Sequence, residues 1–174
     1  MRRFVGLVVV VLLAIGAGYV ANRALIQEPQ PATQVMSPLM RRELVDRVVR
    51  TLEIDGKAGR VVLPVDRVLC AARVFGIEPA TAVKVVDVDV VYARTYCVEV
   101  KPDNQAGVTI LVPIAMHLGA TVRVQRPADG PARQADVENI FPSRLRYAAT
   151  KDDPVDRVLK EDVERRFTEL PPLN

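Results

Sequence analysis

The chain has no tryptophan, and aromatic residues make up only 5% of its 174 residues. Proteins that bind nucleobases or sugars by stacking rely on such side chains. The hydrophobic fraction is nevertheless 49%, and it consists mainly of Val, Leu, Ile and Ala. The composition therefore predicts a packed aliphatic core and argues against a stacking surface.

Motifs of common enzymes are also missing. The chain contains no glycine-rich phosphate loop, no G-x-S-x-G nucleophile motif and no S-x-x-K motif. His117 is its single histidine, and no Cys/His cluster has metal-ligand spacing. We therefore expect a binding or structural protein, not an enzyme, with no catalytic residue, metal site or cofactor.

Two chemical alternatives are weaker. A cysteine beside His117 would form a nucleophilic pair, and Asp87, Asp89 and Glu99 would form a Ca²⁺ site if a hairpin brought them together. Either arrangement in one cleft would point to an exported hydrolase or thiol enzyme. Paired cysteines and a solvated polar strand face explain the same residues more simply.

The chain has only two cysteines, Cys70 and Cys97. Two thiols in an oxidising compartment commonly pair, and closing a loop of roughly 25–30 residues stabilises a fold by about 3–4 kcal/mol on the chain-entropy model. We predict a disulfide that joins the second predicted helix to the second predicted strand. The alternative is that Cys70 is a small buried apolar residue without a partner.

Positive charge is not concentrated in the folded part of the chain. The net charge is +3, but without Arg2 and Arg3 the chain has 22 basic and 21 acidic residues. Basic residues alternate with acidic ones, as in RRELVDRVVR, which is typical of a solvated helix face. Phosphate binding needs clustered positive charge, so we expect no nucleic-acid partner.

A long uncharged stretch, residues 4–22, begins directly after Arg2 and Arg3. Its length is close to what a helix needs to cross a bilayer core. We predict an uncleaved membrane anchor over residues 1–22. A cleaved signal peptide is the alternative, although a cut after Ala21 would place bulky Tyr19 at a position that prefers small residues. The anchor positions that we assign are Phe4, Val8, Leu12, Ile15 and Tyr19.

The basic flank predicts the orientation of this anchor. Because Arg2 and Arg3 precede it, the positive-inside rule keeps the N-terminus in the cytoplasm and places the main domain in the periplasm or outside the cell. Residues 23–38 contain three prolines and read as an extended tether. We then expect a folded domain over 39–170 and a short tail over 171–174.

The hexapeptide PVDRVL occurs twice, at residues 64–69 and 154–159. Each copy has Pro at a first helical turn, an acid near the positive end of the helix dipole, and apolar residues at helical spacing. We predict two helices, the first ending at Gly76. The similarity stops after six residues, so it indicates one local pattern used twice and not a structural repeat. A further helix is predicted to begin at Ser37-Pro38 and to end near the glycines of EIDGKAG.

The middle of the chain changes to a period of two. Four apolar stretches at 82–93, 95–101, 107–116 and 120–126 are separated mainly by turn residues. They predict a roughly four-stranded antiparallel meander flanked by two to three helices, which is an α+β domain. A polar loop over 125–135, with two prolines and a glycine, follows the last strand.

This architecture leads to an expectation about function. A membrane anchor, a tether and a small domain without catalytic groups favour an accessory or scaffold protein of an envelope assembly, such as secretion, transfer or pilus-type machinery. It would act by protein–protein contact, through unpaired sheet edges or the 125–135 loop. The alternative is an exported small-ligand or cell-wall-binding module released by signal cleavage. Homo-oligomerisation is left open.

Overall fold

The computed structural model describes residues 36–151 and 154–170, which belong to one compact unit of the chain. Its α-helices are α2 (Pro38–Ile54), α3 (Gly56–Val62), α4 (Arg133–Ile140), α5 (Ser143–Thr150) and α6 (Val155–Thr168). Its strands are β1 (Val68–Glu78), β2 (Val90–Val100), β3 (Ala106–His117) and β4 (Arg123–Gln125), with short 3₁₀ helices η1 (Val85–Asp87) and η2 (Gly130–Ala132).

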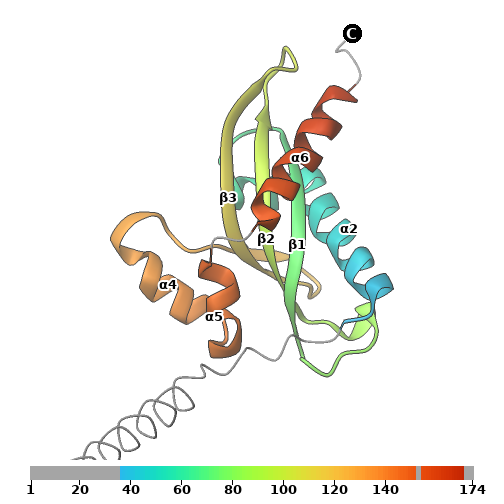
Figure 1. Ribbon diagram of the computed structural model, residues 1–174, viewed down its shortest axis with the longest axis vertical. Helices are drawn as coiled ribbons and strands as arrows, with labels where there is room; N and C mark the ends of the chain where they lie inside the picture. Colours follow the sequence, from blue (N-terminus) through green and yellow to red (C-terminus); the bar gives the residue numbers. More distant parts are fainter. Residues whose placement is uncertain (1–35, 152–153, 171–174) are drawn as a thin grey trace, which may run out of the picture. The chain divides into compact units, whose positions relative to one another are not determined.

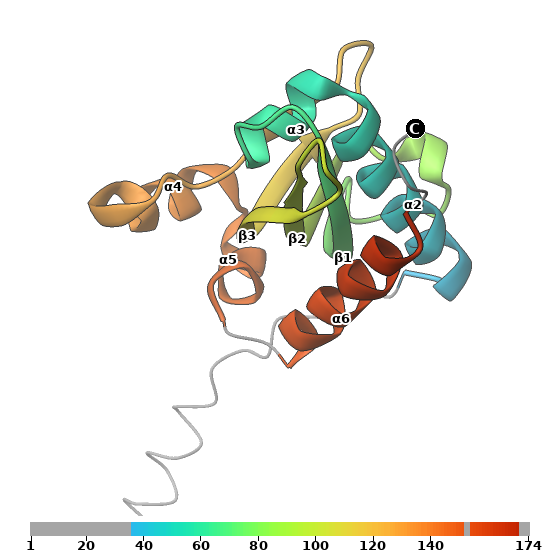
Figure 2. The same ribbon diagram turned by 90° about the horizontal axis from the view of Figure 1, so that it is seen from above.

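The four strands form one antiparallel sheet in the order β1-β2-β3-β4. The sheet lies between two layers of helices, with α2 and α3 on one face and α4, α5 and α6 on the other (Figures 1 and 2). The predicted α+β class and the four-stranded antiparallel meander are therefore confirmed. The expected number of helices was too low, because α3, α4 and α5 are short.

The larger core lies between the sheet and the helices α2 and α3. Helix α2 contributes a stripe of buried residues at helical spacing: Met40, Leu44, Val48 and Leu52. The sheet meets it with alternate aliphatic residues of its three long strands, among them Val74, Val91, Val112, Ile114 and Met116. This packing holds α2 along β1.

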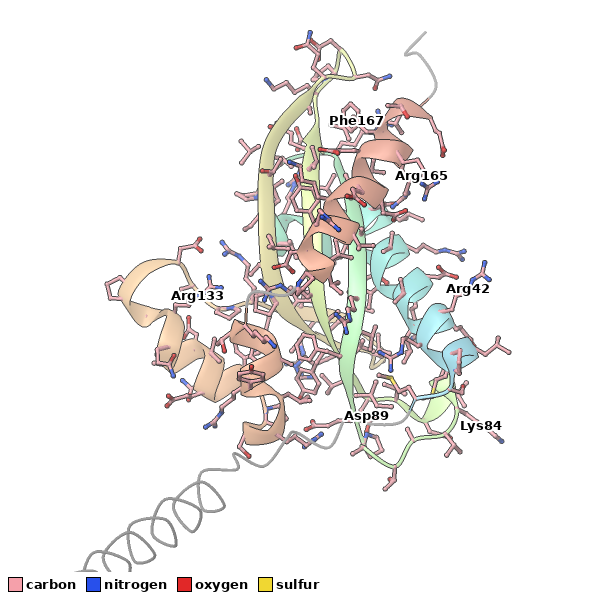
Figure 3. The ribbon with its side chains drawn as sticks, viewed as in Figure 1. Arg42, Lys84, Asp89, Arg133, Arg165 and Phe167 are labelled. Atoms are coloured by element: carbon pink, nitrogen blue, oxygen red, sulfur yellow. A yellow bond between two sulfur atoms is a disulfide. The ribbon has the colours of Figure 1, made fainter. Side chains whose placement is uncertain are left out.

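The opposite face of the sheet carries two smaller clusters. Helix α6 covers one end through Leu159 and Val163. Figure 3 shows Phe167 of α6 toward the strands and Arg165 pointing away from them. Helices α4 and α5 cover the other end with a second cluster, which centres on Phe141, 1% exposed.

The predicted start of the first helix is confirmed. Pro38 is the first residue of α2, and Ser37 caps the helix by accepting a hydrogen bond from the Met40 backbone N–H at 3.2 Å. The helix ends at Ile54, as the following glycines predicted. A second helix, α3, begins directly after it and was not expected.

The first PVDRVL copy was wrongly predicted to start a helix. Residues 68–78 form β1, and almost every residue of this strand is buried. A strand covered by helices on both faces has no alternation of apolar and polar residues, so its pattern cannot be told from that of a buried helix.

Gly76 was predicted as a helix C-cap, and the structure gives it another role. It lies at a register shift between Val74 and Gly76 in the pairing of β1 with β2. A Cβ atom at this position would come within 2.4 Å of the Leu145 side chain of α5. Gly76 thus allows α5 to approach the sheet.

The second PVDRVL copy starts a helix, as predicted. It forms the first turn of α6, and its Asp156 pairs with Arg94 of β2. The corresponding aspartate of the first copy, Asp66, pairs with Arg60 at the surface. The same six residues therefore serve two local structures.

The strand boundaries also differ from the prediction. Asp87 lies in η1 and Asp89 in the loop before β2. The expected strands at 82–93 and 95–101 are replaced by one continuous strand, β2. The sheet still has four strands, because β1 takes the place of the strand lost by this fusion.

Candidate functional site

The outer edge of β1 is covered by side chains from neighbouring helices. The backbone N–H of Cys70 donates to the Glu53 carboxylate at 2.9 Å, and the Cys70 carbonyl accepts from the Arg166 guanidinium at 2.5 Å. Glu53 and Arg166 also form an ion pair with each other at 2.9 Å. An ion pair between α2 and α6 thus supplies the missing hydrogen-bond partners at this point of the edge.

The same protection continues along β1. The Val74 carbonyl accepts a hydrogen bond from Arg41 of α2 at 3.1 Å. The Ile77 carbonyl accepts from Arg144 of α5 at 3.4 Å. Because side chains already occupy these outward-facing groups, β1 is poorly suited to accept a further strand.

The other edge of the sheet is different, because β4 is short. It pairs only with the last part of β3, residues 115–117. The hydrogen bond from the Leu118 backbone N–H to the Asp89 carbonyl, at 2.7 Å, fixes which residues of β3 face β2. In an antiparallel pair, hydrogen-bonded and non-hydrogen-bonded residue pairs alternate. Continuing this alternation places the backbone groups of Thr109, Leu111 and Pro113 on the outer side.

Pro113 supports this assignment independently. It lies opposite Arg94, and proline has no N–H to donate, so it is tolerated where its nitrogen faces outward. Within the described residues, no side chain is hydrogen bonded to the outward backbone groups of Thr109 or Leu111. The edge of β3 over residues 109–113, called here the β3 edge, is therefore left uncovered by the part of the chain that the structure describes.

Cys70 and Cys97 form a disulfide in the structure. They lie directly opposite each other on β1 and β2, with their Cα atoms 4.1 Å apart. The bridge was expected to join a helix to a strand, and it joins two neighbouring strands because residues 68–78 are not helical. Both residues are fully buried under α2.

The two alternative chemical sites are not assembled. His117 lies at the end of β3, seven residues beyond the partner of Cys97, and its Nε2 is 2.9 Å from Oε1 of Gln125. Asp89 precedes β2 in the chain, whereas Glu99 lies near the far end of that strand. Among the described residues, no three Cys, His, Asp or Glu side chains are arranged to hold a metal ion.

The 125–135 loop is more ordered than a polar connector would suggest. Arg126 donates to the Val61 carbonyl of α3 at 3.0 Å and pairs with Asp129 at 3.2 Å. The Ala128 N–H donates to the Asp136 carboxylate at 2.8 Å. These bonds hold the start of the loop against α3. The rest of the segment forms η2 and the first turn of α4.

A cleft of about 340 Å³ lies between α3 and β4. Its lining residues are Lys57, Ala58, Val61, His117, Val122, Arg123, Val124 and Gln125. The sequence did not predict it, because α3 was not expected as a separate helix. Its cationic residues, Lys57 and Arg123, come from segments more than sixty residues apart.

The phenol of Tyr92 is a weaker acid than that of an ordinary tyrosine. Burial, followed by hydrogen bonding to the Glu78 carboxylate, raises the pKa of Tyr92 to about 12. It packs against Phe141, with ring centroids 5.8 Å apart. The phenol therefore stays protonated at neutral pH, and the ring of Tyr92 packs in the core cluster around Phe141.

The predicted membrane anchor lies outside the described residues, including its topology determinants Arg2 and Arg3. Over residues 36–151 and 154–170, no helix combines the length and apolar character that crossing a bilayer requires. Comparison of the chain with protein-family models, curated proteins and solved structures finds no significant match.

Proposed function

We propose that the protein is a membrane-anchored scaffold whose folded domain binds an extended segment of a partner protein at the β3 edge. Residues 1–22 anchor it in the inner or plasma membrane with the N-terminus in the cytoplasm. The domain lies on the other side, where it contributes to an envelope assembly. It acts by protein contact and not by catalysis.

The contrast between the two sheet edges carries this proposal. Side chains from three helices cover β1, whereas the outward N–H and C=O groups of Thr109 and Leu111 have no such cover among the described residues. An exposed edge with unpaired backbone groups readily accepts a strand, so folded proteins usually protect it. An edge that is left open beside a protected one is suited to strand addition, in which main-chain hydrogen bonds provide the affinity.

The side chains around the β3 edge support binding by an apolar segment. Val108 is 59% exposed next to it, and Leu111 is partly buried against the cluster under α6. Alternate side chains of an added strand would lie along these two faces. The partner segment is therefore expected to be extended and to carry aliphatic residues.

The anchor and tether support the membrane location. The residues before α2, 23–37, span roughly 50 Å at most when fully extended, so the domain stays close to the bilayer. The disulfide fits an oxidising compartment. A reporter fused to the C-terminus tests this orientation: activity only in the cytoplasm would contradict it.

Site-specific photo-crosslinking in cells tests the β3 edge. In the test variant, a photoreactive amino acid replaces Val108 in the full-length chain. In the positional control, the same photoreactive amino acid replaces Val158 of α6, which is 55% exposed. We expect a discrete crosslinked partner from position 108 and not from position 158. A crosslink to a second copy of the chain would instead assign the edge to self-association.

A matched pair of substitutions makes the test specific for the backbone. Thr109→Pro removes an outward N–H while leaving the hydrogen bonds between β2 and β3 in place, and Thr109→Ala changes only the side chain. Thr109→Lys adds a charge that disfavours edge pairing. We expect the proline and lysine variants to lose the crosslink and the alanine variant to keep it. Unchanged crosslinking in Thr109→Pro would refute strand addition.

A further inference from the structure

We propose that the cleft between α3 and β4 is a binding site for a short aliphatic carboxylate. This site is separate from the β3 edge, and the two proposals stand or fall independently. Its volume of about 340 Å³ is at the lower end of the range of about 300–1,000 Å³ typical of small-molecule sites. A ligand with a short chain therefore fits it better than a large cofactor does.

The charge of the cleft selects an anion. Lys57 and Arg123 line it, and none of its lining residues is acidic. Within the described part of the chain, no carboxylate lies within ion-pair distance of either side chain. Their donors are therefore available to a ligand, and Arg offers the planar paired geometry that a carboxylate fits.

The remaining walls of the cleft select an apolar portion. Three valines and an alanine line it: Ala58, Val61, Val122 and Val124. Contact with these side chains would remove the aliphatic part of a ligand from water. Inorganic phosphate provides charge without this portion and is expected to bind more weakly than a carboxylate with an alkyl chain.

The cleft is built from fixed elements. Arg126 joins the end of β4 to the Val61 carbonyl, and close packing holds α3, because a Cβ atom at Gly59 would lie 2.5 Å from the Leu52 carbonyl oxygen of α2. The side chains of His117 and Gln125 are held together at 2.9 Å. Elements that are held in place before binding reduce its entropic cost.

The test titrates pentanoate into the full-length protein in nanodiscs of zwitterionic lipid, with ¹³C-methyl-labelled valines as reporters. We expect saturable shifts of the valines that line the cleft. Pentanamide, which has the same chain without the charge, should bind at least about tenfold more weakly, because a hydrogen bond to a charged group contributes roughly this factor. Inorganic phosphate should also bind at least about tenfold more weakly, because it lacks the alkyl chain and burying each CH₂ contributes about 0.8 kcal/mol. Absence of saturable shifts at millimolar pentanoate, or equal binding of pentanamide, would overturn the proposal.

Charge-removing variants locate the binding. Lys57→Gln and Arg123→Gln should each raise the Kd for pentanoate by about tenfold or more. Arg133→Gln is the matched control, since Arg133 is a partly exposed arginine at the start of α4 outside the cleft (Figure 3). Lys57 and Arg123 are exposed and Arg133 is partly exposed, so the fold should tolerate each change. An unchanged Kd in both cleft variants, or an equal rise in Arg133→Gln, would refute the assignment.

Discussion

The ion pair between Arg94 and Asp156 provides the sharpest test of how α6 is held on the sheet. The Arg94 side chain is 8% exposed and that of Asp156 is 19% exposed. Arg94 Nε lies 2.6 Å from Oδ1 of Asp156, and its Nη2 lies 2.8 Å from Oδ2, so the contact is bidentate. Arg94 Nη1 also donates to the Ala149 carbonyl at 3.4 Å. One buried guanidinium thus joins β2 to both α5 and α6.

Asp156→Asn removes the countercharge and leaves the buried guanidinium in place. Breaking such a pair typically costs about 3–5 kcal/mol, because the remaining charge stays desolvated. Asn keeps one acceptor, so we expect the free energy of unfolding to fall by about 3 kcal/mol. This change is measured by urea denaturation of the full-length protein in detergent with the disulfide intact. Circular dichroism monitors the unfolding.

Two comparisons decide the interpretation. Asp162→Asn breaks an exposed pair with Arg165 and should cost less than about 1 kcal/mol. Replacing both buried partners, with Arg94→Met and Asp156→Leu together, should restore much of the loss, because no charge is then left without its partner. The reasoning is wrong if Asp156→Asn lowers the free energy of unfolding no more than Asp162→Asn does. It is also wrong if the effects of Arg94→Met and Asp156→Leu on that free energy are additive.

Three further results are expected from the same denaturation assay. Replacing Cys70 and Cys97 together with Ala should lower the free energy of unfolding by about 3–4 kcal/mol, since the bridge closes a separation of 27 residues; a loss below about 1 kcal/mol would contradict this. Gly76→Ala should cost about 1–3 kcal/mol by forcing the buried leucine of α5 aside, and stability equal to wild type would show that α5 adapts freely. The raised pKa of Tyr92 predicts a loss of about 1–2 kcal/mol between about pH 10 and about pH 12, because the unfolded chain releases the phenol proton first. Tyr92→Phe should lack this component, so identical pH profiles of the two proteins would exclude it.

The parts of the fold that were predictable are those with one buried face. Helix α2 has an N-cap at Ser37 and an apolar stripe, and both are local properties of the sequence. Strand β1 was not predictable in this way, because helices cover both of its faces and remove the alternation that identifies a strand. Its identity depends on α2 and α6, which lie on either side of it in sequence.

The candidate site was predictable only in outline. The sequence indicated unpaired sheet edges, but which edge is covered depends on contacts such as that between Glu53 and Arg166, 113 residues apart. The cleft likewise combines Lys57 with Arg123, and no local pattern connects the two. The pairing of Cys70 with Cys97 followed from the cysteine count, whereas their direct opposition on neighbouring strands did not.

The unequal edges of the sheet set a limit on stoichiometry. A sheet with two open edges can be extended from both sides, and repeated extension produces a filament. Here, helix side chains already bind outward backbone groups of Cys70, Val74 and Ile77 on β1, so a strand added at the β3 edge would not readily be matched by a second strand at β1. The domain would then end a row of strands and not propagate it, and each copy would hold a single partner segment.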